Sequence, residues 1–215
     1  DALKCWTVAS LLEPDNHKTY NSLGKAFYKL GKTEKAVEQW MEALRLNTDD
    51  AESHFNLAEA FVDQDKFDEA IEHFNEALRI KPRWPDLRYN LGNIYYSQGR
   101  FELSIKQYAE ALRFQPDFLE ARLGLARSFT KMGKTKAAAE NYYRILEREP
   151  ERIEALNDLA WILAVTKDAD VRNPADAVKF AQKACDLTKY EQPEILDTLA
   201  VAYAAAGKFE QAIET

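Results

Sequence analysis

The chain has few of the residues that usually build cross-links and irregular loops. Its 215 residues include only two cysteines, seven glycines and seven prolines. Cys5 and Cys185 lie near opposite ends, with no CxxC pair and no nearby histidine pair, so a disulfide framework is not expected. We expect both to be reduced residues that pack between helices.

Long apolar runs are also missing. The longest, from Ala160 to Val165, is far shorter than the roughly 20 residues that a membrane helix needs. The first residues do not show a basic segment followed by an apolar one, so no signal or other targeting segment is visible.

Positive charge is in deficit. Lysine and arginine number 29 against 36 acidic residues, which gives a formal net charge of -7. Such a surface on average repels nucleic-acid backbones and anionic membranes, so we expect this segment to contact neither. Residues 51–84 carry four basic and eight acidic side chains, whereas residues 119–152 carry eight and five. This segmentation favours a partner that has a basic end and an acidic end.

Internal repetition is what the sequence has in abundance. A leucine recurs with a constant 34-residue period, each followed at once by glycine or alanine and, one helical turn beyond the leucine, by a large apolar side chain. The leucines are Leu23, Leu57, Leu91, Leu125 and Leu159. A second pattern has the same period and pairs a small residue with an aromatic one a turn later, as in Ala36 and Trp40. Spacings of three and four place these side chains on one helical face, so each unit is predicted to contain two amphipathic helices.

Turn signals mark the boundaries of the units. Pro82, Pro116 and Pro150 recur at the end of the second helix, where proline cannot continue the hydrogen-bond ladder. The predicted division of the chain is 1–16, 17–50, 51–84, 85–118, 119–152, 153–192 and 193–215, of which the first and last are truncated. The unit 153–192 is expanded by about five residues before Asn173, which is predicted to cap a helix that begins at Pro174.

This pattern resembles the tetratricopeptide repeat (TPR) family over nearly the whole chain. The resemblance implies an all-α fold, a right-handed α-α superhelix (solenoid) of tandem 34-residue helix-turn-helix repeats over residues 1–215. In that family the first helix of each unit lines a concave groove. The resemblance therefore predicts a scaffold for protein-protein interaction, which binds a protein or peptide segment in the groove, and no enzyme activity in this segment.

At the groove positions of the family this chain has amides, aromatic rings and charged side chains. The predicted binding residues are Asn21, Lys25, Tyr28, Phe55, Asn56, Tyr89, Asn90, Asn93, Tyr96, Arg127 and Trp161. An asparagine side chain has both a donor and an acceptor, so Asn56 and Asn90 would bind the backbone of an extended peptide. The aromatic members would be apolar anchors. The alternative interpretation is that these side chains are solvated or pack against their neighbours.

Motifs that would suggest phosphate binding or metal binding are incomplete. GKT at Gly31 and at Gly133 lacks the earlier glycine of a phosphate loop and lies in a turn between helices. His17, His54 and His73 are few and lack metal-ligand spacing. We therefore predict no catalytic residue, no metal site and no cofactor in this segment.

Two more specific functions are suggested by the family. A carboxylate clamp for chaperone tails needs a basic residue where this chain has Asp86, so a chaperone adaptor is not expected. The expanded unit followed by PEILDTLAVAYAAAG resembles the last repeats of large bacterial TPR proteins, some of which are fused to glycosyltransferases. The alternative function is therefore the repeat arm of a larger glycosyltransferase, similar to O-linked N-acetylglucosamine transferases, whose catalytic domain lies outside this segment.

Both ends of the sequence fall inside a predicted repeat, so we expect the chain to be a fragment of a longer protein. Self-association through the truncated ends is a third alternative. A cytoplasmic location is favoured, although a signal or membrane anchor upstream would change it.

Overall fold

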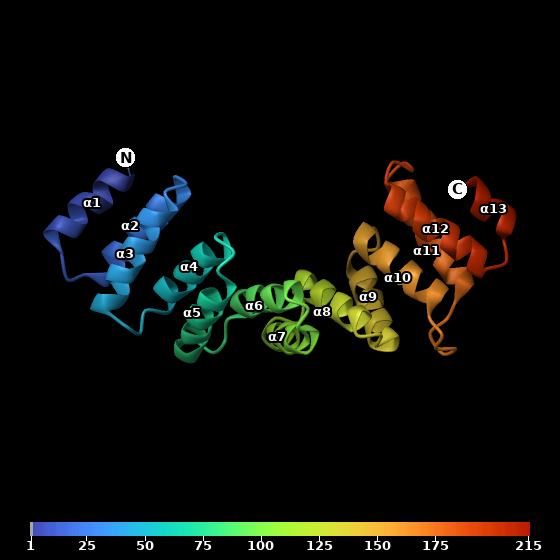
Figure 1. Ribbon diagram of the computed structural model, residues 1–215, viewed down its shortest axis with the longest axis horizontal. Helices are drawn as coiled ribbons and strands as arrows, with labels where there is room; N and C mark the ends of the chain where they lie inside the picture. The colour runs from blue at the N-terminus through green and yellow to red at the C-terminus, as the bar shows by residue number, and fades with distance from the viewer. Residues whose placement is uncertain (1) are drawn as a thin grey trace. The chain divides into compact units, whose positions relative to one another are not determined.

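The structure, a computed structural model, describes residues 2–215, with side chains from residue 4. Over this range it contains thirteen α-helices and no β-strand, which confirms the predicted all-α fold class. Asp1, the first residue of the predicted range 1–16, lies outside the described residues. The chain forms two compact units, residues 1–87 and 88–215, and each is described by itself (Figure 1).

The first unit consists of paired helices joined by short turns. Its helices are α1 (Ala2–Leu12), α2 (His17–Lys29), α3 (Thr33–Leu46), α4 (Ala51–Val62), α5 (Phe67–Ile80) and the beginning of α6 (Pro85–Ser97). α2 packs against α3 and α4 against α5, while α1 contacts α2 and α3 contacts α4. Trp40 and Leu57 are fully buried between these helices, at the positions where the 34-residue pattern predicts core side chains.

The second unit continues the same arrangement. Beyond the rest of α6 it contains α7 (Phe101–Phe114), α8 (Leu119–Lys131), α9 (Thr135–Arg148), α10 (Ile153–Val165), α11 (Pro174–Leu187), α12 (Pro193–Ala205) and α13 (Phe209–Glu214). α10 packs against α11, its partner in the hairpin, and also against α9 of the preceding hairpin and α12 of the following one. This nearest-neighbour packing is how repeat proteins bury faces that one hairpin alone leaves exposed.

Apart from the expanded turn between α10 and α11, the turns inside the hairpins share one geometry. Gly31, Gly99, Gly133 and Gly207 have positive φ angles, between 69 and 74°, and Asp65 takes the same place with φ 57°. In the first of these turns the amide of Lys32 donates to the carbonyl of Phe27, 3.0 Å away. Equivalent bonds close the other four turns, which satisfies carbonyls that the end of an α-helix leaves open.

The expanded turn between α10 and α11 is ordered by its own hydrogen bonds. The carbonyl of Asp168 accepts from the amides of Val171 and Arg172, and the amide of Asn173 donates to the carbonyl of Leu163. The Asn173 side chain accepts from the amide of Asp176 at 3.1 Å, and Pro174 is the first helical residue. The predicted helix cap is therefore confirmed, and α11 packs against α10.

Close helix contact depends on the small residue that follows each repeated leucine. A Cβ atom on Gly24 would lie 2.5 Å from Nε1 of Trp40, which is only 1% exposed and donates from Nε1 to the carbonyl of Asn21. Glycine at position 24 thus lets α2 approach the indole ring on α3. The repeat pattern couples the two helices of a hairpin through this contact.

Gly24→Ala should therefore destabilise the first unit, by about 1–3 kcal/mol, because overpacking outweighs the gain in helix propensity. Urea denaturation measures the loss. In a Trp40→Phe background the same substitution should cost less, since the smaller ring leaves room for the methyl group. An equal loss in both backgrounds would show that the indole ring is not the obstacle.

Two histidines in the first unit form a pair that sequence spacing did not suggest. His54 Nε2 donates to the carbonyl of Thr48, so its Nδ1 accepts a hydrogen bond from His73 Nδ1 at 2.9 Å. Burial and the neighbouring His54 lower the pKa of His73, and Glu72 and Glu76 raise it by less. The folded unit thus favours neutral His73.

This pairing makes the stability of the first unit depend on pH. The unfolded chain binds a proton at His73 near the usual pKa of 6.5, and the folded chain binds it only at lower pH. Stability is complete above pH 6.5 and falls as the pH drops through the lowered folded pKa. In His73→Asn, whose amide can still donate to His54, the loss of unfolding free energy between pH 7 and pH 5 should be smaller. Identical slopes in both proteins would contradict this assignment.

Candidate functional site

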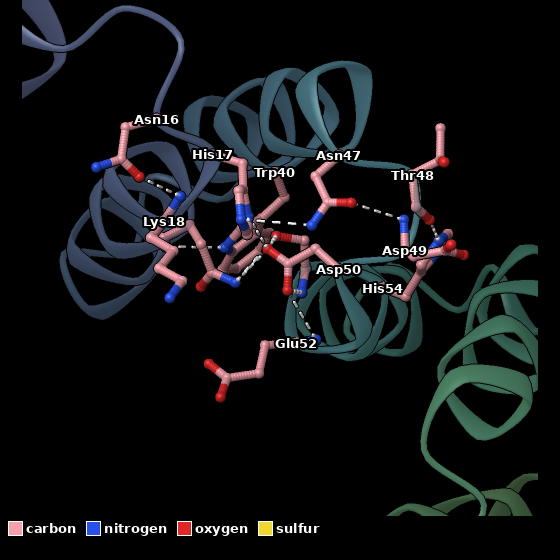
Figure 2. Close-up of polar contacts among 12 residues, drawn as sticks. Asn16, His17, Lys18, Trp40, Asn47, Thr48, Asp49, Asp50, Glu52 and His54 are labelled. Carbon is pink, nitrogen blue, oxygen red and sulfur yellow. Dashed lines mark hydrogen bonds and ion pairs between the residues drawn. The ribbon is translucent and has the colours of Figure 1, made fainter.

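In the first unit, Asp50, the N-cap of α4, is the centre of a polar network (Figure 2). One oxygen of the Asp50 carboxylate accepts from the amides of Glu52 and Ser53. The other accepts from Ser53 Oγ at 2.8 Å and from His17 Nδ1 at 3.0 Å. Asn47 donates to Nε2 of His17, which places the imidazole proton on Nδ1.

Hydrogen bonding outweighs burial at this carboxylate. Partial burial alone would raise the pKa of Asp50, but bonds from His17, Ser53 and Asn21 hold it below its usual value of 3.8. Asp50 is therefore a charged structural centre that fixes the start of α2 against the start of α4.

Asn21, a predicted ligand-binding residue, is part of this network. It is only 5% exposed, its amide donates to Ser53 Oγ at 2.9 Å and to Asp50, and its side-chain carbonyl accepts from Asn56. These bonds use both of its amide hydrogens. Asn21 and Asn56 thus link successive repeats, and the buried Asn21 has a structural role beneath the surface.

The other predicted residues of the first unit also have partners within it. Lys25 forms an exposed ion pair with Glu52 at 2.8 Å, and the hydroxyl of Tyr28 donates to Asp63. The ring of Phe55 stacks on Trp84, with centroids 4.8 Å apart. Asn21 and Lys25 line a cavity of about 550 Å³ with His17 and Asp50, whereas Tyr28, Phe55 and Asn56 lie outside it.

Asp50→Ala should lower the unfolding free energy of the first unit by about 2 kcal/mol at pH 7, because it removes a helix cap and leaves buried donors unpaired. Asp49→Ala is the matched control. Asp49 is exposed and pairs with Arg79 on the surface, so its removal should cost less than about 1 kcal/mol. Equal losses of unfolding free energy in the two variants, measured by urea denaturation, would show that Asp50 has no special role.

In the second unit, five of the six predicted residues line a cleft with two adjoining parts. The first cleft, about 290 Å³, is lined by Tyr89, Asn93, Tyr96 and Arg127 among other residues. The second cleft, about 400 Å³, is lined by Tyr96, Arg127 and Trp161. Because Tyr96 and Arg127 belong to both linings, the two parts adjoin. Five predicted residues therefore share one surface, while Asn90 lines neither part.

The floor of the first cleft is set by Tyr108 on α7. Its hydroxyl donates to Asn93 Oδ1 at 2.7 Å, and burial raises its pKa, so the phenol stays protonated. A Cβ on Gly124 would lie 2.5 Å from the Tyr108 ring, so glycine there admits the ring beneath α8. Tyr89 packs against both Tyr108 and Phe118, which fixes an aromatic rim.

The arginines of the cleft have carboxylate partners. Arg127 Nε donates to Asp158 at 3.0 Å, and the same carboxylate oxygen accepts from the buried Tyr142 hydroxyl at 3.2 Å. Although partial burial alone would lower it, the pKa of Arg127 is raised by Asp158. Arg152 contacts three acidic residues, Glu120, Glu149 and Glu154. These guanidinium groups thus hold the walls of the cleft together, and neither is available as an unpaired clamp for an anion.

Some residues of the cleft are absent from the predicted set. The second cleft also includes Asn157 and Asp158 from α10 and Glu194, Asp197 and Thr198 from α12. Asn157 and Asp158 follow the 34-residue spacing. Glu194, Asp197 and Thr198 stand at the same distances along the chain from Leu199 as the groove residues of other repeats do from their repeated leucine. Leu199 follows Leu159 at a longer interval because of the expanded turn.

Repeated helical hairpins with a groove-like cleft on their first helices define a class of helical repeat proteins. Models described as "TPR repeat" match residues 24–65, 58–99 and 92–133, and one described as "Tetratricopeptide repeat" matches residues 123–192. The chain belongs to the tetratricopeptide repeat family. The predicted family is thus confirmed.

Solved structures show the same fold at low sequence identity. YrrB, described as a TPR protein with an unusual peptide-binding site, is 19% identical, with a TM-score of 0.78 over 96% of this chain and 100% of that chain. A crystal structure of MamA is 24% identical, with a TM-score of 0.65 over 70% of this chain and 88% of that one. PilF of Pseudomonas aeruginosa is 20% identical, with a TM-score of 0.70 and coverage of 94% and 89%.

No curated protein matches the sequence. None of the helices in the described range combines the length and the apolar character that a membrane crossing requires.

Proposed function

We propose that the chain is a protein-interaction scaffold, and that the two-part cleft of the second unit binds an extended segment of a protein partner. The observation that carries this proposal is that Tyr89, Asn93, Tyr96, Arg127 and Trp161, which the family resemblance assigned to the groove, line the two adjoining parts of one cleft. Membership of the TPR family and the likeness to YrrB support it.

The composition of the cleft suits a peptide. Tyr96 is partly exposed and Trp161 is 43% exposed, so much of each ring is open to a ligand. Aromatic side chains of this kind are common anchors at protein interfaces because they bury a large area at a small entropic cost. Around them, Asn93 and Thr130 supply polar groups that can pair with a peptide backbone.

The unit also holds the cleft in shape before any ligand arrives. The Arg127–Asp158–Tyr142 bonds join α8, α9 and α10, and the Tyr108–Asn93 bond joins α7 to α6. A preformed site lowers the entropic cost of binding.

A library of random 12-residue peptides displayed on phage tests the proposal. Peptides selected on the wild-type chain should bind Trp161→Ala and Tyr96→Ala about tenfold or more weakly, as measured by fluorescence anisotropy, since each change removes an anchor. Phe209→Ala is the control, because Phe209 is 65% exposed on α13 and lines neither cleft.

Circular dichroism should show the same thermal transition for the wild-type chain, Trp161→Ala and Phe209→Ala, because those rings are exposed, and a helical, folded chain for Tyr96→Ala, whose ring also packs against Phe101. Two results would overturn the proposal: no peptide enriched on the wild-type chain, or unchanged affinity in both cleft variants.

A further inference from the structure

The second cleft presents electron-rich groups from two helices that pack together. α10 contributes Asn157 and Trp161, which lie one helical turn apart on the same face. α12 contributes Glu194 and Asp197, which are three positions apart and share a face for the same reason. An indole face, an amide oxygen and two carboxylates are all groups that accept hydrogen bonds or attract cations.

The side chain of Asn157 lacks a hydrogen-bond donor for its oxygen. Its Oδ1 atom is buried and has no hydrogen-bond partner among the described residues. A buried acceptor without a donor destabilises the folded chain by about 1–3 kcal/mol, so such an atom calls for an explanation. Asn157 lines the second cleft, so a ligand there whose N–H group reaches this oxygen would satisfy it.

The charges of the cleft favour a cation. Glu194 and Asp197 are exposed and neither forms an ion pair within residues 2–215. Arg127 is matched by Asp158, so these two lining charges cancel. Lys131 on α8 is the remaining positive charge of the lining and opposes two carboxylates, which leaves the cleft with net charge -1.

We propose that the second cleft binds an arginine side chain of the peptide partner, with its guanidinium over Trp161 and its N–H groups directed to Asn157, Glu194 and Asp197. This inference rests on the proposed function and deepens it. Guanidinium is planar, always charged and carries five N–H donors, so it matches an aromatic face bordered by acceptors better than any other side chain does. An ammonium group has three donors and no flat face, so lysine should bind less well.

The test uses the same random 12-residue library. Peptides selected on the wild-type chain should be enriched in arginine over lysine, glutamate and aspartate. On the Glu194→Gln, Asp197→Asn double variant this enrichment should disappear, because the acceptors remain but their charge is lost. The control is Glu191→Gln, Glu210→Gln, which removes two exposed negative charges from the same unit outside the cleft and should keep the enrichment.

A selected peptide then gives the size of the effect. Replacing its arginine by citrulline, which keeps the shape and removes the charge, should weaken binding to the wild-type chain about tenfold and binding to the double variant much less. Lys131→Gln should strengthen binding of the arginine peptide, since it removes the opposing charge.

The outcomes separate this inference from the proposed function. Peptides that need Trp161 and Tyr96 but show no arginine enrichment, or are enriched in acidic residues, would overturn the inference and leave the function standing. Enrichment that persists on the double variant would also overturn it. A failure to select any peptide would overturn both.

Discussion

The approach of a large aromatic ring on one helix to a small residue on its neighbour is the contact on which the rest of the structure depends. In the first unit, Trp40 fits against Gly24, and in the second, Tyr108 fits against Gly124. This contact fixes the distance between helices, and that distance decides which side chains remain at the surface of the first helices. In the second unit the ring that fills the core also forms the floor of the first cleft, so packing and binding surface are set by the same residue.

The two units use the groove positions differently. In the first unit, Asn21 and Asn56 bond to each other and to the Asp50 network, so their polarity stabilises the repeat stack. In the second unit, ion pairs such as Arg127 with Asp158 connect neighbouring helices at the edge of the cleft and leave aromatic rings exposed between them. Equivalent sequence positions therefore act as structural links in one unit and as a candidate binding surface in the other.

The helices and their order were predictable because every repeat places one apolar face on each of its helices, and even the Asn173 cap followed from local residue types. Whether an individual groove residue is exposed or bonded to a neighbouring helix was not predictable. Asn21 is buried because it bonds to Asp50 and Ser53 at the start of another helix, α4. The His54–His73 pair forms only because α4 and α5 pack with these two side chains next to each other. Glu194 and Asp197 were missed because the expanded turn makes the interval before the last unit longer than the constant period of the others. Side-chain pairing across helices is set by three-dimensional packing, and sequence spacing alone does not contain it.

The proposed binding of a partner segment in the cleft of the second unit can be observed directly. The most direct measurement is the indole N–H spectrum of the four tryptophans, recorded by nuclear magnetic resonance while a peptide selected on the chain is added. If the segment binds there, the Trp161 resonance should shift in a saturable way, and the buried Trp40 resonance of the first unit should not. A bound peptide that leaves Trp161 unchanged would contradict it.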